Sequence, residues 1–229
     1  MQFQEELTHT LSRTPANLEG LSELIDPAWI TQALQATGSA SVRKRKLPAE
    51  HVVWLVIGLA LFRNQPIWGI VHQLQLSLGD VQCAPSAAVQ GRQRLGDAAL
   101  EHLFRQLTTA WSSQIGLPKR TGAPALAALR VLAVDGVVWS APDSTSNRQA
   151  LGCCSNQHGQ GSWPQLRAVC LMDTFSHELL DAQLGAMTQG ELTLAQALQP
   201  PPGSVTVFDR AYFSAAFLLD WQARGAQCH

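Results

Sequence analysis

Apolar residues in the first 120 positions recur at helical spacing. Leu18, Leu21 and Leu24 lie on one face of a helix, and Pro27 suits the first turn of the next one. The almost wholly apolar run 52–62 predicts a helix that is buried on all sides. Ser86 is the expected N-cap of a later helix. The expected helices cover residues 18–25, 27–36, 48–62, 67–76, 87–95 and 98–114.

After residue 130 the pattern changes to short runs that are typical of strands. The first run, 131–138, is interrupted by Asp135-Gly136, and the polar stretch 142–162 predicts a weak strand or an irregular excursion. Polar residues 173–178 separate two apolar runs and predict a hairpin. The other expected elements are strands over 166–172, 179–184 and 205–208, helices over 191–198 and 214–223, and the opening of a strand at 226–229.

This order of elements predicts an α/β chain. An all-helical N-terminal region, residues 1–120, is followed by an incomplete ribonuclease-H-like mixed sheet with helices, residues 125–229, whose C-terminal part is missing. The loop 117–124 is the expected boundary between them, because it combines proline, glycine and basic residues.

Composition and charge narrow the class of protein. Hydrophobic residues make up 46% of the chain and charged residues 14%, which is typical of a globular protein. No apolar run is long enough to span a membrane, and five cysteines without CxxC spacing favour a reducing cytoplasm. Residues 43–130 carry eleven basic and four acidic side chains, whereas residues 131–229 carry four basic and eight acidic ones. This change from a basic to an acidic segment is expected if a phosphate-binding segment precedes a carboxylate-bearing one. Chance clustering of charges on a solvated surface explains the same change equally well.

Two aspartates share a physical setting. Asp135 follows the apolar run 131–134 and Asp209 follows 205–208. Either residue alone is more often part of a turn, but if the two strands are parallel neighbours, their carboxyl ends bring the carboxylates together. Such a pair is a candidate site for Mg²⁺ or Mn²⁺, and two ions about 4 Å apart can activate a water and stabilise the leaving oxygen of a phosphodiester.

Basic and amide side chains are candidates for contacts with double-stranded DNA. A run of four cations precedes the apolar helix and can neutralise phosphates, unless it is a solvated linker. In the helix over 87–95, one face carries glutamine and arginine and could contact base edges, although such a face is more often simply solvated. The candidate residues are Arg43, Lys44, Arg45, Lys46, Gln90, Arg92, Gln93, Arg94 and, beside the second aspartate, Arg210.

Other residues that could carry chemistry have simpler structural roles. Asp173 falls in the predicted hairpin turn, where aspartate binds backbone amides, and Asp143 fits a turn as well. Cys153, Cys154 and His158 do not have the spacing of a common zinc site.

Five segments resemble, in the same order, segments of the IS-four-type DDE transposases. They are residues 86–96 (SAAVQGRQRLG), 134–144 (VDGVVWSAPDS), 163–172 (WPQLRAVCLM), 188–194 (TQGELTL) and 208–213 (FDRAYF). The resemblance covers nearly the whole chain. It implies binding of transposon ends, magnesium-dependent cleavage and strand transfer, with Asp135 and Asp209 as metal ligands, and a second copy or an intact transposase as partner.

One departure from the family's pattern concerns the third acidic ligand. In the family it lies on a later helix, in a tyrosine–arginine–x–x–x–glutamate segment, but only twenty residues follow Asp209 here. Glu191 is a poor substitute, because it precedes the second aspartate and lies on a different helix. We therefore expect little or no catalysis by this chain alone. The alternatives are a DNA-binding inhibitor of transposition without catalytic activity and a decayed, non-functional fragment.

Overall fold

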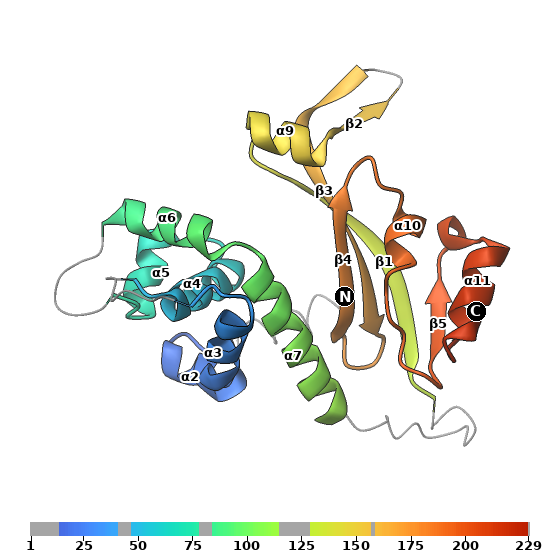
Figure 1. Cartoon of the computed structure of the whole chain (residues 1–229), viewed down its shortest axis with the longest axis horizontal. Helices are drawn as coiled ribbons and strands as arrows, with labels where there is room; N and C mark the ends of the chain where they lie inside the picture. The colour runs from blue at the N-terminus through green and yellow to red at the C-terminus, as the bar shows by residue number, and fades with distance from the viewer. Residues whose placement is uncertain (1–13, 41–46, 78–83, 115–128, 157–158, 229) are drawn as a thin grey trace. The chain divides into compact units, whose positions relative to one another are not determined.

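The computed structural model of the chain describes residues 14–40, 47–77, 84–114, 129–156 and 159–228 (Figure 1). The chain divides into two compact units, Met1–Leu107 and Thr108–His229. The division falls within a helix, and each unit is considered by itself.

The first unit is helical, as the sequence predicts. Asp26 caps its second helix by accepting a hydrogen bond from the Ala28 amide, with Pro27 in the first turn. None of the helices in the described ranges is long and apolar enough to cross a membrane. The helices are α2 (Leu18–Leu24), α3 (Pro27–Ala36), α4 (Ala49–Leu61), α5 (Ile67–Gln73), α6 (Pro85–Leu95) and α7 (Ala98–Gln114).

Two helix ends differ from the prediction. Helix α5 stops at Gln73 and not at residue 76, because Gln75 adopts a left-handed φ of 50° and the Leu76 amide closes the turn on Val71. Helix α6 begins at Pro85, so Ser86 lies inside the helix and does not cap it. The loop expected at 117–124 lies outside the described residues.

Helix α4 forms the centre of the first unit. Its residues Val52 to Leu55 are buried, but Leu61 is 37% exposed, so the prediction of burial on all sides is wrong for its last turn. Helix α6 packs on it closely, because a Cβ on Gly91 would lie 2.9 Å from Val52 Cγ2.

The second unit is built on a mixed sheet with helices, which confirms the predicted fold class. The sheet has the order β2-β3-β1-β5-β6, with β4 paired to β3; β1 is antiparallel to β3 and parallel to β5 (Figure 1). The strands are β1 (Val131–Ser140), β2 (Cys153–Asn156), β3 (Gly159–Asp173), β4 (Leu179–Ala186), β5 (Val205–Phe208) and β6 (Gln227–Cys228). The helices are α9 (Thr145–Leu151), α10 (Glu191–Ala195), the 3-10 turn η1 (Arg210–Tyr212) and α11 (Ala215–Ala223).

Three elements of this unit depart from the prediction. Strand β1 continues through Asp135-Gly136 to Ser140, because β3 pairs with it along its length. The polar stretch 142–162 contains the predicted weak strand, as β2 and the start of β3, but also helix α9, which Ser144 caps by accepting a hydrogen bond from the Asn147 amide. Helix α10 is shorter than the expected 191–198 and ends at Ala195.

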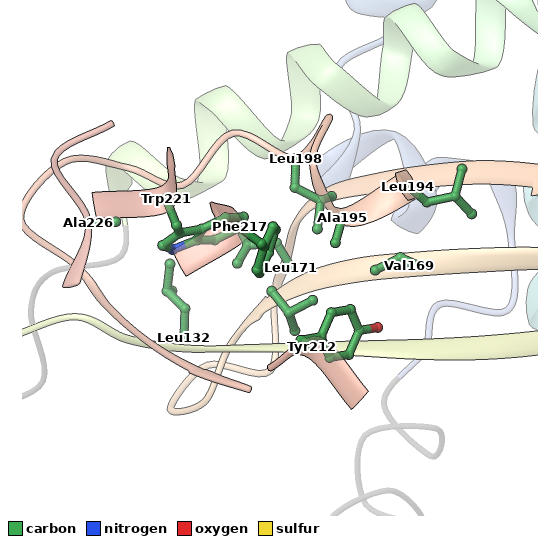
Figure 2. Packing of buried hydrophobic residues seen from close by; sticks show 11 residues of the cluster. Leu132, Val169, Leu171, Leu194, Ala195, Leu198, Tyr212, Phe217, Trp221 and Ala226 are labelled. Atoms are coloured by element: carbon green, nitrogen blue, oxygen red, sulfur yellow. The ribbon is translucent and has the colours of Figure 1, made fainter. Parts of the chain in front are cut away.

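An aromatic cluster joins α11 to the sheet. Phe208, the last residue of β5, packs edge-to-face on Phe217 and Trp221, with ring centroids 5.3 and 5.1 Å apart. The Trp221 Nε1–H donates a buried hydrogen bond to Thr206 Oγ1, at 3.1 Å. Figure 2 shows Phe217 and Trp221 packed among the buried aliphatic side chains of this core. These contacts fix where β5 ends.

The β3–β4 hairpin is held by Asp173, in the structural role that the sequence predicts. The Asp173 carboxylate is buried and accepts hydrogen bonds from the Phe175 and Ser176 amides and, at 2.7 Å, from Arg130 Nε. Burial alone would raise the pKa of Asp173, but the hydrogen bonds from Arg130 and the two amides outweigh it and hold that pKa below its usual value.

We expect Asp173→Asn to lower the free energy of unfolding by about 2 kcal/mol at pH 7, because hydrogen bonds to charged groups contribute roughly 1.5–3 kcal/mol. The folded-state pKa is depressed, so this contribution is present above the unfolded pKa of about 3.9 and is lost as pH falls through the folded value. Urea unfolding followed by circular dichroism should therefore show the difference shrinking as pH falls below about 3.9. A difference that does not shrink with falling pH would contradict this account, and Glu23→Gln, at an exposed position of α2, is the control.

Candidate functional site

The two predicted aspartates come directly after the paired part of β1 and β5. Asp209 follows the end of β5, as the sequence predicts, but Asp135 lies inside β1, which continues to Ser140 because β3 pairs with it there. Strands β1 and β5 are parallel, and their last registered pair is Val134 with Phe208. Asp135 and Asp209 each come one residue later along their strands. The parallel pairing that the sequence argument required is therefore present.

Side-chain alternation sends both carboxylates away from the core. Val134 is buried and Phe208 packs against the same hydrophobic cluster, whereas Asp135 and Asp209 are exposed. Cys170 is the cross-strand neighbour of Asp135. Burial raises the pKa of the Cys170 thiol, and the negative charge of Asp135 adds to that effect. The sheet thus carries an anionic edge where β5 ends.

Each aspartate uses one oxygen locally and leaves the other available. Asp135 Oδ1 accepts a hydrogen bond from the Gly136 amide at 2.8 Å, and Asp209 Oδ1 accepts one from the Ala211 amide at 2.7 Å. These bonds orient the two carboxylates, and the second oxygen of each is free of hydrogen bonds within the described part of the chain.

These oxygens fit a hard divalent cation. Mg²⁺ is commonly held by one or two carboxylates, with waters and substrate phosphates in its other positions. The described residues contain no group of three or more histidine, cysteine, aspartate or glutamate side chains close enough to hold a metal ion. Asp135 and Asp209 would therefore hold it as a pair, and a bound ion would supply Lewis-acid activation of a phosphodiester.

An open cleft of about 530 Å³ lies beside the second aspartate. Arg210, exposed at this cleft, makes no ion pair within the described ranges, so its charge is available to a ligand. The cleft is lined by Phe208, Asp209, Arg210, Tyr212, Phe213, Leu218 and Cys228.

Glu191 was set aside on sequence grounds, yet the structure brings its carboxyl group to the first aspartate's strand. A Cβ on Gly136 would lie 2.7 Å from Glu191 Cδ, so only glycine leaves room for this approach. Arg167 Nε lies 3.7 Å from Glu191 Oε1. The sequence signal that could have found it is the glycine itself, inside a strand and directly after Asp135.

Tyr212 is the second residue that the sequence argument missed. Its side chain is 1% exposed, and its hydroxyl has no hydrogen-bond partner among the described residues. Burial raises the pKa of Tyr212 far above its usual value, and the charges of Glu191, Asp135 and Asp209 add to the rise. The phenol therefore stays protonated and can act as a donor. In Figure 2 its oxygen points away from Phe217.

Among the other residues considered in this unit, only Asp143 has described side-chain contacts that bear on its role. Asp143 forms an ion pair with Arg148, whose hydrogen bond holds the pKa of Asp143 below its usual value. The Cys154 side chain and His158 lie outside what the structure describes, so the zinc argument is not tested by them.

In the first unit, α6 has the two faces that its sequence predicts. Ala88, Gly91 and Leu95 are buried, and the opposite side is exposed. The predicted DNA-contacting residues Gln90, Arg92, Gln93 and Arg94 are all exposed, as are Ser86 and Val89. The run Arg43, Lys44, Arg45 and Lys46 lies outside the described residues.

The chain matches two known families in sequence order. Residues 15–105 match the family described as "Insertion element 4 transposase N-terminal". Residues 127–228 match the family described as "Transposase DDE domain".

Two proteins of Escherichia coli (strain K12) are similar over most of the chain. Identity is 34% over 216 residues with the transposase InsG for insertion sequence element IS4, covering 93% of this chain and 48% of InsG. With the putative transposase InsZ it is 32% over 222 residues, covering 94% of this chain and 71% of InsZ. The chain thus spans about half the length of InsG.

A solved structure, the Mos1 transposase paired-end complex with left transposon end, aligns with 82% of this chain and 60% of its own. The TM-score is 0.28 and the identity 12%, which is too low to support a structural argument.

We expect Tyr212→Phe to raise the free energy of unfolding by about 1 kcal/mol in metal-free buffer, because a buried polar group without a partner costs roughly 1–3 kcal/mol. Thr206→Val is the matched control: it removes a hydroxyl that does accept a hydrogen bond, from Trp221, and should lower stability by about the same amount. Urea unfolding measures both. A destabilised Tyr212→Phe chain would show that the hydroxyl has a partner after all.

Proposed function

The chain belongs to the IS-four-type family of DDE transposases, and from this premise we propose that it binds the ends of an insertion sequence and contributes two metal-binding carboxylates to their cleavage. The observation that carries the proposal is the parallel pairing of β1 with β5, whose last registered pair, Val134 with Phe208, directly precedes Asp135 and Asp209. Two exposed carboxylates with free oxygens suit phosphodiester chemistry assisted by Mg²⁺ or Mn²⁺.

The two parts of the chain have different roles in this proposal. Residues 1–120 form the DNA-binding region and residues 125–229 form part of the catalytic domain. The binding surface is the exposed face of α6, where Arg92 and Arg94 contact phosphates or base edges of double-stranded DNA. The cations of residues 43–46 add further phosphate contacts.

Within the second part, the chain's own side chains position the phosphodiester. Asp135 and Asp209 are oriented by the amides of Gly136 and Ala211, which leaves one oxygen of each for an ion. Arg210, at the cleft beside Asp209, binds a phosphate oxygen of the DNA. Magnesium or manganese would supply the Lewis acid.

We assign strand cleavage and transfer to a protein of full family length. The chain spans 48% of InsG, and the described residues hold no third carboxylate grouped with Asp135 and Asp209. With two ligands the ions would be poorly placed, and a displacement of about 1 Å can reduce a rate about a hundredfold. Residues 1–229 alone are therefore expected to bind DNA in the bacterial cytoplasm with little cleavage.

A second function follows from the same division. The exposed α6 face is independent of the carboxylates, so the chain could occupy transposon ends, alone or as a homodimer, and inhibit an intact transposase. End binding that survives Asp135→Asn, with no nicking in any metal, would favour this inhibitor.

In a protein of full family length, Asp135→Asn or Asp209→Asn should reduce nicking of a labelled transposon end in Mg²⁺ by at least about a hundredfold. DNA binding should change little, because both residues lie outside the proposed binding region. Gel separation of the nicked strand measures the rate, with Asp220→Asn as a control. Full activity in either variant would remove that aspartate from the reaction.

The double variant Arg92→Gln/Arg94→Gln should weaken binding of residues 1–229 to double-stranded DNA. If both cations contact phosphates, the slope of log affinity against log salt falls by about 2, since each contact contributes about 0.9. Fluorescence anisotropy over a salt series measures this. The matched control is Arg105→Gln, which removes a cation that is already paired with Glu101. An unchanged slope would place the DNA surface elsewhere.

A further inference from the structure

We propose that Glu191, which forms an ion pair with Arg167, is an outer-sphere carboxylate of the divalent-cation site at Asp135 and Asp209. It acts as a positioning residue through the hydration shell of the ion. This inference rests on the proposed function, since it needs the two aspartates to hold a cation.

The placement of Glu191 is specific. It is the first residue of α10, directly after the N-cap Gly190, and is 34% exposed at its side chain. Its carboxyl carbon occupies the space that a Cβ on Gly136 would fill. Because Gly136 follows Asp135, the Glu191 carboxyl group is packed against the strand residue next to the first metal-binding candidate.

Arg167 holds this carboxylate in place. Its Nη1 donates a hydrogen bond of 2.6 Å to the carbonyl of Gln189, just before α10, and its Nε lies 3.7 Å from Glu191 Oε1. The guanidinium side chain is 18% exposed, so the pair is only partly screened by solvent. One Glu191 oxygen faces Arg167, and the other makes no hydrogen bond within the described residues.

Tyr212 supplies an independent sign that something is bound here. Its hydroxyl is buried and has no partner among the residues described, which is unusual for a native protein. The charge that acts on it most strongly is that of Glu191, followed by those of Asp135 and Asp209. A small movement of Glu191 would let the phenol donate to its carboxylate and set its orientation.

The carboxylate works indirectly. Glu191 does not belong to any metal-holding group of three acidic, histidine or cysteine side chains in the described ranges. Glu191 packs against Gly136, one residue past Asp135, and is not grouped directly with the pair, so we place it outside the direct ligands of the ion. Neighbouring carboxylates repel unless a cation bridges them, so a third negative charge strengthens cation binding. Replacing a residue that hydrogen-bonds to the direct ligands of a metal commonly lowers the metal affinity 10–100-fold.

The test is a calorimetric titration of residues 1–229 with MnCl₂ and with MgCl₂. Glu191→Gln keeps the size of the side chain and removes its charge, and should weaken Mn²⁺ binding about tenfold. Tyr212→Phe removes only the unpartnered hydroxyl and should weaken it several-fold while stabilising the metal-free chain. Asp220→Asn should leave binding unchanged. Circular dichroism confirms that each variant folds.

The outcomes separate the inference from the proposed function. If Asp135→Asn and Asp209→Asn abolish binding while Glu191→Gln and Tyr212→Phe both leave it unchanged, Glu191 is only a packing residue and the inference is overturned. If Asp135→Asn and Asp209→Asn bind Mn²⁺ as tightly as the natural chain, the metal site itself is wrong and the proposed function fails with it. The inference is supported if Glu191→Gln and Tyr212→Phe both weaken Mn²⁺ binding while Asp220→Asn leaves it unchanged.

Discussion

The parallel pairing of β1 with β5 is the constraint on which the candidate site depends. Seventy-four positions separate Asp135 from Asp209 in the sequence, and only this pairing brings their strand ends together. The pairing is stabilised from one side of the sheet, where Phe208 packs on the aromatic rings of α11 and Trp221 donates a buried hydrogen bond to Thr206. Burial of these side chains thus positions two carboxylates that themselves stay exposed to solvent.

The core side of the same region of the sheet carries polar groups that add nothing to hydrophobic packing. Glu191, Arg167 and the Tyr212 hydroxyl lie beneath the strand ends, and the Tyr212 hydroxyl has no partner among the described residues. A core selected for stability alone would have phenylalanine at position 212, because an unsatisfied buried hydroxyl costs free energy. Departures of this kind are expected where a protein gives up stability for binding or catalysis. A cation held at the proposed site would account for all three groups together.

The two units divide the proposed work according to their charges. The helical unit presents amide and guanidinium groups on the outer face of α6, while its inner face packs on α4 through Gly91. The second unit presents the exposed carboxylates of Asp135 and Asp209. This agrees with the charge pattern along the chain, which is basic over 43–130 and acidic after it. Cationic side chains attract phosphates, whereas carboxylates bind metal ions. Placing the two kinds of side chain in separate units prevents them from neutralising each other.

The sequence by itself determined most of the helices and strands, and the end of β5 before Asp209. Helical spacing in the first 120 residues, the apolar run 205–208 and the Asp173 hairpin are local patterns, and each encodes which side of one element is buried. Only the tertiary structure decided that β1 runs unbroken past Asp135, that α9 forms in the polar stretch, and that Glu191 meets Gly136. These depend on the long partner strand β3 and on the return of α10 over the sheet. A pattern along the chain shows that a residue is buried or exposed, but not which distant surface it meets.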